Sequence, residues 1–281
     1  MPVRIGLSGA SAVAREGREA FFKYLDSIEA QGWDSIWFSD RIVGPSWTLD
    51  PLVGMSMVAA RTERLKFGTG ILLMSMRSPV TTARNLASLD LLSGGRLLLG
   101  VGVGQEATTE YDAMGIRKRE RGQRLDESIN LMRLLWKEEK ITYESEFLKL
   151  NEASIYPKPK DGNIPIWIGG RTEAAFRRVG RFGDGWLPTQ VTAADVAKGI
   201  QTIKTYASEI GRQIEEDHVG VQLGCYLVEN GPLPMDKIRQ HLLLRRQDVT
   251  PEQLHLLGTP AQVQDRIREF IDAGATKFVL S

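Results

Sequence analysis

Residues 165–172 have the sequence PIWIGGRT, in which a short apolar run meets a glycine pair and then the start of a predicted helix. A continuous apolar run is typical of a parallel strand that is buried on both faces. The helix that follows carries Ala175, Phe176 and Val179 on one face. A strand, a tight glycine turn and an amphipathic helix together form the repeating unit of α/β proteins.

The same alternation recurs along the chain with little linker between the elements. Further strands are predicted at 3–7, 35–38, 65–72, 97–101, 185–187, 219–228 and 276–280. Eight strands that alternate with helices indicate a closed barrel or a doubly wound sheet. Since a (β/α)8 barrel typically needs about 250 residues, we predict a single TIM-barrel domain over residues 1–281.

The predicted helices have apolar stripes and recognisable ends. The stripes are Phe21, Leu25 and Ile28; then Leu125, Ile129, Met132 and Trp136; then Val196, Ile200, Ile203 and Ile210. Asp50 precedes Pro51, and Thr259 precedes Pro260, so that each supplies a capping side chain before a proline at the first helical position. Two stretches, 141–160 and 230–258, break the alternation and are predicted to be insertions between barrel elements, where active-site lids often arise.

The composition excludes several classes of function. Thirty-six Lys and Arg residues against 35 Asp and Glu give a formal net charge of +1, which offers no general attraction to nucleic acid or to an anionic membrane. The lone cysteine, Cys225, excludes an internal disulfide and is expected to be a small buried apolar residue. No apolar run approaches the roughly 18 residues of a membrane span, and no signal peptide is recognised, so that we expect a cytoplasmic protein.

The histidines, the glycine-rich run and the end of the last predicted strand each carry a further prediction. The histidines, His218, His241 and His255, share no metal-ligand spacing, and we predict no metal site. The run Gly100–Gly104 is G-x-G-x-G rather than the dinucleotide fingerprint G-x-G-x-x-G. The last predicted strand ends at Leu280 with no helix after it, so that another element or a second subunit is expected to cover it. On that ground we predict a homodimer.

Glycine is enriched where the predicted strands end, and active sites of such barrels lie at these carboxyl ends. The strand-end segments are Ser39–Arg41, Gly68–Ile71, Gly100–Glu106 and Gly169–Thr172. Glycine lets a flat ring or a phosphate approach the backbone closely. The amides at Gly169 and Gly170, with Arg171 beside them, suit an anion at a helix N-terminus. A tight turn without a ligand explains the glycine pair equally well.

Five motifs in order resemble the luciferase-like monooxygenase superfamily, in particular its branch of probable coenzyme F420-dependent oxidoreductases. They are GWDSIWFSD (32–40), TERLKFGTG (62–70), LDLLSGGR (89–96), PIWIGG (165–170) and GDGW (183–186), and the resemblance runs over nearly the whole chain. It implies a barrel whose deazaflavin ring lies over the strand ends, with the phosphate near the fifth and sixth strands. It also implies a cis, non-prolyl peptide bond at Gly70–Ile71 that braces the ring. The residues that the resemblance assigns to cofactor binding are Asp40, Gly70, Ile71, Gly102, Gly104, Gly169, Gly170, Arg171 and Gly185.

Two positions depart from the family pattern. Relatives often have a histidine that faces the substrate where this chain has Arg41. Arginine stays charged at ordinary pH and cannot act as a general base, although it could clamp an anionic substrate. Some relatives place a proton-donating glutamate directly after the fourth-strand glycines, whereas here Gln105 intervenes before Glu106. Glu106 is the candidate acid, and a solvated carboxylate at a helix start is the alternative.

The leading functional prediction is hydride transfer between F420 and a small organic substrate. The first alternative keeps the fold but uses reduced FMN and molecular oxygen, as a monooxygenase. The second is a non-catalytic flavin-binding protein, an alternative that Arg41 keeps open. The motifs do not identify the substrate.

Overall fold

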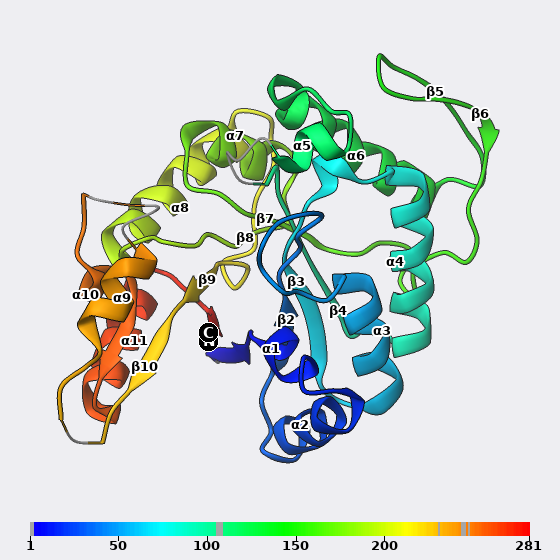
Figure 1. The fold of residues 1–281 in the computed structure, drawn as a ribbon. Helices are drawn as coiled ribbons and strands as arrows, with labels where there is room; N and C mark the ends of the chain where they lie inside the picture. Colours follow the sequence, from blue (N-terminus) through cyan, green and yellow to red (C-terminus); the bar gives the residue numbers. More distant parts are fainter. Residues whose placement is uncertain (1–2, 105–108, 230, 243–245, 247) are drawn as a thin grey trace. The chain divides into compact units, whose positions relative to one another are not determined.

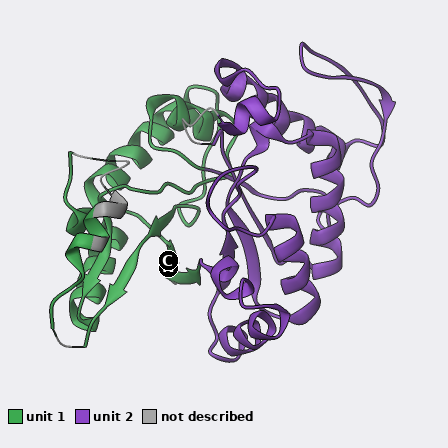
Figure 2. Cartoon of the chain, in the orientation of Figure 1, with its two compact units in different colours: residues 1–7, 169–281 green, residues 8–168 purple. Residues whose placement is uncertain are grey.

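The computed structural model describes residues 3–104, 109–229, 231–242, 246 and 248–281, and it divides into two compact units. Unit 1 consists of residues 1–7 and 169–281, and unit 2 consists of residues 8–168 (Figure 2). None of the described helices is long and apolar enough to cross a membrane.

Unit 2 is built on a parallel sheet of four strands. They are β2 (Ser35–Phe38), β3 (Lys66–Leu72), β4 (Leu97–Val101) and β7 (Ile166–Ile168), paired in that order. Every residue of β2 and β7 is buried, which agrees with their unbroken apolar sequences. All four strands lie within one residue of the predicted ranges.

Helices α3, α4 and α6 flank this sheet (Figure 1). The helices of unit 2 are α1 (Ala10–Ala14), α2 (Arg18–Ala30), α3 (Pro51–Arg61), α4 (Pro79–Ser93), α5 (Thr109–Ala113) and α6 (Arg121–Lys137), with short 3-10 turns η1 (Met74–Met76) and η2 (Lys118–Glu120). The two apolar stripes predicted at α2 and α6 are buried throughout. Trp136 of α6 donates a hydrogen bond from Nε1 to the carbonyl of Ala83 on α4 (3.0 Å), which fixes the contact between these two helices. The predicted cap at Asp50 is confirmed, since its carboxylate accepts from the amide of Leu52 at 2.9 Å.

Unit 1 contains three parallel strands, β1 (Arg4–Leu7), β12 (Lys277–Leu280) and β9 (Gly220–Leu223), paired in that order. The short strand β8 (Gly185–Trp186) lies beside β9 through an isolated bridge from Trp186 to Val219. Its helices are α7 (Glu173–Phe182), α8 (Ala193–Ser208), α9 (Met235–Leu242), α10 (Pro251–Leu254) and α11 (Pro260–Asp272). The predicted cap at Thr259 is confirmed at the start of α11, where Thr259 forms a capping box with Gln262.

The predicted strand 219–228 is wrong as one element, because the chain breaks at Gly224. Its second half is β10 (Cys225–Leu227), which pairs with β11 (Leu256–Gly258) instead of continuing β9. The amide of Gly224 donates to Nδ1 of His255 at 2.9 Å, and a Cβ at Gly224 would lie 2.6 Å from that nitrogen. His255 therefore has a structural role, and only glycine fits at the break.

Two smaller expectations are also corrected. Cys225 is only partly buried, because it lies on the two-stranded pair rather than in the main sheet. Burial still raises the pKa of its thiol, which disfavours the reactive thiolate. Ile210 is 50% exposed and lies beyond the end of α8, so that it does not extend the stripe of that helix.

Both predicted insertions contain structure of their own. Residues 141–160 include an antiparallel hairpin of β5 (Ile141–Glu144) and β6 (Lys149–Ala153). The second, 230–258, contains α9, α10 and β11. Its residues 230, 243–245 and 247 lie outside the described part of the chain.

Candidate active site

The carboxylate of Asp40 is fully buried just after β2, and it is held by residues that follow β3. Its Oδ1 accepts from Arg77 at 2.7 Å, and its Oδ2 accepts from Nε of Arg77 and from the amide of Leu73, both at 2.9 Å. Arg77 also contacts Asp50 at 2.8 Å. Burial disfavours the charge on Arg77, but these two carboxylates outweigh it and raise the pKa of the guanidinium above its usual value. Asp40 thus joins the ends of two neighbouring strands.

The end of β3 carries the backbone feature that the resemblance implies. The peptide bond between Gly70 and Ile71 is cis, and the register between β3 and β4 shifts between Thr69 and Leu72. Phe67, Gly68 and Thr69 are buried, whereas Gly70 and Ile71 are partly exposed. The bulged cis peptide is therefore confirmed in its expected place, while its role in cofactor binding stays a prediction.

The glycines after β4 leave no room for side chains. A Cβ on Gly102 would lie 2.0 Å from Cδ1 of Ile71, so that this glycine packs directly against the bulge. Gly104 has a φ of +83°, and a Cβ there would lie 3.0 Å from Cε of Met76 and 3.2 Å from the hydroxyl of Tyr111. That hydroxyl donates to the carbonyl of Val103. These contacts fix the backbone that follows the strand, where Val103 and Gly104 are partly exposed.

Gly70, Ile71, Val103 and Gly104 are thus partly exposed at the ends of the neighbouring strands β3 and β4. Two of these four residues are glycines, which let the face of a flat ring approach the backbone closely. Glu106, the candidate acid, lies outside the described residues.

Arg41 forms an ion pair with Glu110 that the sequence did not predict. The NH1 group of Arg41 donates to Oε2 of Glu110 at 3.2 Å, and the amide of Ile42 donates to Oε1 at 2.9 Å. The side chain of Glu110 is 3% exposed, while that of Arg41 is 22% exposed. Glu110 lies 69 positions away on α5, and no local pattern links the two residues.

The glycine pair after β7 leads into α7 as predicted. Gly170 has a φ of +110°, and its carbonyl accepts from Nε1 of Trp186 at 2.8 Å. Thr172 caps the helix by accepting from the amide of Ala175 at 3.4 Å. Gly170, Arg171 and Thr172 are exposed, so that an anion has access to this turn. Binding of a phosphate here stays a prediction.

Gly185, in contrast, is buried at the start of β8 rather than at its carboxyl end. Its assignment to the cofactor stays a prediction, and this position gives it no support.

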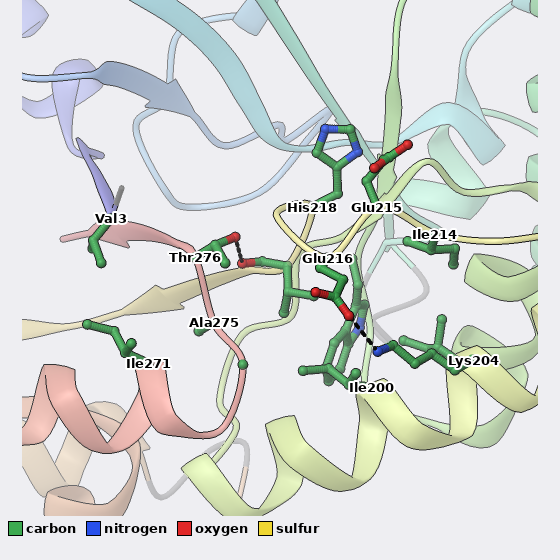
Figure 3. A pocket seen from close by; sticks show the side chains of 14 residues that line it. Val3, Ile200, Lys204, Ile214, Glu215, Glu216, His218, Ile271, Ala275 and Thr276 are labelled. Atoms are coloured by element: carbon green, nitrogen blue, oxygen red, sulfur yellow. Dashed lines mark hydrogen bonds and ion pairs between the residues drawn. The ribbon is translucent and has the colours of Figure 1, made fainter. Parts of the chain in front are cut away.

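A cavity of about 320 Å³ lies in unit 1 (Figure 3). Its wall includes Val3, Val219 and Thr276, which immediately precede β1, β9 and β12. The cavity therefore lies at the amino ends of these strands. Ligands of parallel α/β sheets bind outside the carboxyl ends, and we do not assign the candidate site to this cavity.

Comparison with known proteins agrees with this geometry. The family model described as luciferase-like monooxygenase matches residues 6–242. An F420-dependent glucose-6-phosphate dehydrogenase from Nakamurella multipartita is 31% identical, with 100% of this chain and 84% of the relative covered. The protein of the same name from Segniliparus rotundus is 30% identical, with 94% of this chain and 80% of the relative covered.

A solved structure supports the fold. An F420-dependent secondary alcohol dehydrogenase in complex with an F420–acetone adduct superimposes with a TM-score of 0.85 at 20% identity, over 100% of this chain and 93% of the other. The predicted fold, a (β/α)8 barrel of the luciferase-like type, is therefore confirmed. Together with the family match over most of the sequence, this shows that the chain belongs to the luciferase-like monooxygenase family.

Proposed function

We propose that this chain is an oxidoreductase that transfers a hydride between coenzyme F420 and a small organic substrate. The observation that carries the proposal is the 31% identity, over the whole chain, to a relative named as F420-dependent. The partly exposed residues at the strand ends, Gly70, Ile71 and Gly104, and the packing of Gly102 against Ile71 support a ring-binding surface there.

The residues proposed to hold the cofactor have different tasks. When bound, F420 supplies the two-electron hydride chemistry, and the protein supplies binding and orientation. Gly70, Ile71 and Gly104 are partly exposed and are proposed to contact the ring, whereas Asp40 and Gly102 are buried and are proposed to fix the neighbouring backbone, Asp40 through the amide of Leu73 and Gly102 through its contact with Ile71. Gly169, Gly170 and Arg171 are proposed to bind the phosphate.

Arg41 is proposed to face the substrate in place of the family histidine. Because a guanidinium keeps its proton, Arg41 orients a substrate oxygen by donating hydrogen bonds and does not accept the proton that leaves with the hydride. Glu106 remains the proposed proton-handling residue. Burial of the reacting groups against the strand ends would exclude competing water.

The first alternative is an FMN-dependent monooxygenase that uses molecular oxygen. The two functions differ in the cofactor bound and in oxygen use, so that one set of measurements separates them. Tryptophan-fluorescence quenching is measured during titration with F420 and, separately, with FMN. Turnover is then measured with glucose 6-phosphate and short secondary alcohols as candidate hydride donors, which the names of the relatives and of the structural neighbour suggest.

Tight binding of F420 with loss of its visible absorbance on adding a donor is the expected result. Tight binding of FMN with oxygen uptake would overturn the proposal in favour of the monooxygenase. Binding of F420 without turnover over the whole panel would favour the non-catalytic flavin-binding protein. Arg171→Ala tests the phosphate assignment, because it is expected to weaken F420 binding without altering the fold of an exposed turn.

A further inference from the structure

Glu110 is a buried carboxylate at the carboxyl ends of the unit 2 strands, and both of its oxygens are occupied. Its side chain is 3% exposed, and the donors are the guanidinium of Arg41 and the amide of Ile42. A buried charge is retained at a large desolvation cost unless it is paired and hydrogen-bonded. Glu110 meets that condition through two consecutive residues of the segment that follows β2.

We propose that Glu110 is a positioning residue that holds Arg41 in its working orientation. The inference deepens the proposed function, in which Arg41 faces the substrate, and rests on it for the catalytic consequence. The ion pair itself is a property of the fold.

The geometry around Arg41 fixes the side chain without covering it. Its Cδ packs over Gly44, where a Cβ would lie 3.3 Å away. The side chain nevertheless keeps 22% of its surface exposed, so that a small molecule can reach it. A long, flexible side chain loses much rotamer entropy when it is held in this way. The ion pair with the buried carboxylate of Glu110 offsets that loss.

The preceding residue is fixed in the same manner but with the charges reversed. Asp40 is held by Arg77 from the segment after β3, and Arg41 is held by Glu110 from α5 after β4. Two adjacent residues of one strand end are therefore fixed by two different elements. This arrangement restrains both side chains at the end of β2.

Two substitutions separate the charge from the hydrogen bonds. Glu110→Gln keeps an oxygen that can accept from the amide of Ile42 but removes the charge that attracts Arg41. Glu110→Ala removes both interactions and leaves a small cavity. If the charge positions Arg41, then Glu110→Gln already releases the guanidinium while the fold is retained.

The first test measures the guanidinium directly and needs no substrate. Phenylglyoxal, which reacts with arginine side chains, is added to the folded protein, and the rate of labelling at each arginine is read by peptide mass spectrometry. In Glu110→Gln, Arg41 is expected to label several-fold faster than in the unaltered protein. Arg77 serves as an internal control, since its partners Asp40 and Asp50 are unchanged. Glu146→Gln removes an exposed ion pair with Arg117 and should leave Arg41 unaffected.

Unchanged labelling of Arg41 in Glu110→Gln would overturn the proposal. Equal acceleration at Arg41 and Arg77 would also overturn it, because general loosening of the fold would then explain the effect. Glu110→Ala is expected to match Glu110→Gln at Arg41, and it adds a lower melting temperature through the lost amide contact.

The second test addresses catalysis by a double-mutant cycle of Glu110→Gln and Arg41→Ala. Turnover of F420 is followed with glucose 6-phosphate and with a short secondary alcohol. Glu110→Gln is expected to lower kcat/KM in the presence of Arg41 and to have no further effect in the Arg41→Ala background. Additive losses would overturn the proposal. Absence of turnover in the unaltered protein would refute the proposed function alone, since the labelling result decides the ion pair independently.

Discussion

Gly102 and Ile71 illustrate how a single missing side chain shapes the candidate site. A Cβ at Gly102 would lie 2.0 Å from Cδ1, 3.3 Å from Cγ1 and 3.8 Å from Cβ of Ile71. The steric clash of an added Cβ would therefore involve mainly the terminal methyl group (Cδ1) of Ile71. Because Ile71 is partly exposed, its displacement would alter the surface proposed to receive the cofactor ring.

Gly102→Ala is expected to destabilise the protein by about 1–2 kcal/mol, as overpacking commonly does. It is also expected to weaken F420 binding by about tenfold, which corresponds to about 1.4 kcal/mol. Urea unfolding and fluorescence titration measure the two effects. Ile71→Val removes the methyl group in conflict, so that the double variant should regain most of both losses. Failure of that rescue would show that Gly102 is required for a reason other than Ile71.

Asp40 and Asp50 share one partner, Arg77, but differ in burial. The side chain of Asp40 is fully buried, whereas that of Asp50 is 43% exposed. Loss of the buried carboxylate of Asp40 leaves Arg77, whose side chain is 16% exposed, with the exposed partner Asp50. Removal of a buried partner is costly, whereas exposed pairs contribute little.

Asp40→Asn is expected to lower the free energy of unfolding by about 3 kcal/mol. Asp50→Asn should lower it by less than about 1 kcal/mol, because asparagine also caps helices well. Urea denaturation of both variants provides the comparison. Equal losses would contradict the argument from burial.

At the scale of elements, Arg246 connects the second insertion, residues 230–258, to the start of α8 through hydrogen bonds. It donates to Asp195 at 2.6 Å, to the carbonyl of Gln190 at 3.1 Å and to Asp248 at 2.9 Å. Asp195 belongs to the capping box of α8 with Thr192. Burial alone would raise the pKa of Asp195, but hydrogen bonds from Arg246 and Thr192 hold it below its usual value of 3.8. The hydrogen bond from Arg246 also lowers the pKa of Asp248.

A carboxylate with a lowered pKa stabilises the folded state above its usual pKa, and this contribution is lost as the pH falls through the lowered value. Arg246→Ala should therefore lower the urea midpoint at pH 7. The difference from the unaltered protein should shrink as the pH falls below about 4. Arg268→Ala, which removes an exposed pair with Asp265, is the matched control. A difference that persists undiminished at low pH would show that the carboxylates are not what Arg246 stabilises.

The elements differ in how far the sequence predicts them. The apolar runs of β2 and β7 and the caps at Asp50 and Thr259 depend on neighbours in the sequence, and they were predicted to within a residue or two. The break at Gly224 depends on His255, which lies 31 positions away, and the ion pair of Glu110 with Arg41 spans 69 positions. Such contacts exist only after the strands are assembled. Family motifs located the cis peptide, whereas they gave no sign of Glu110, which occupies no recognised motif.

For the molecule as a whole, the similarity of 0.85 in TM-score to an F420-dependent enzyme concerns the backbone, while the identity there is only 20%. A shared barrel is compatible with many chemistries. A cofactor test on the intact chain is therefore more decisive than further comparison of folds, and ligand binding is linked to stability in a measurable way.

F420 at about 100 times its dissociation constant should stabilise the protein by about 2.7 kcal/mol, because it binds the folded state alone. For a chain of 281 residues, that corresponds to a rise in melting temperature of roughly 5 °C. FMN at the same concentration should produce a smaller shift, and Gly102→Ala should reduce the shift with F420. If unit 1 and unit 2 unfold in separate steps, the unit that binds F420 is the one whose melting temperature rises. Equal shifts with F420 and FMN would mean that the site recognises a flavin-like ring without the selectivity that the proposed function requires.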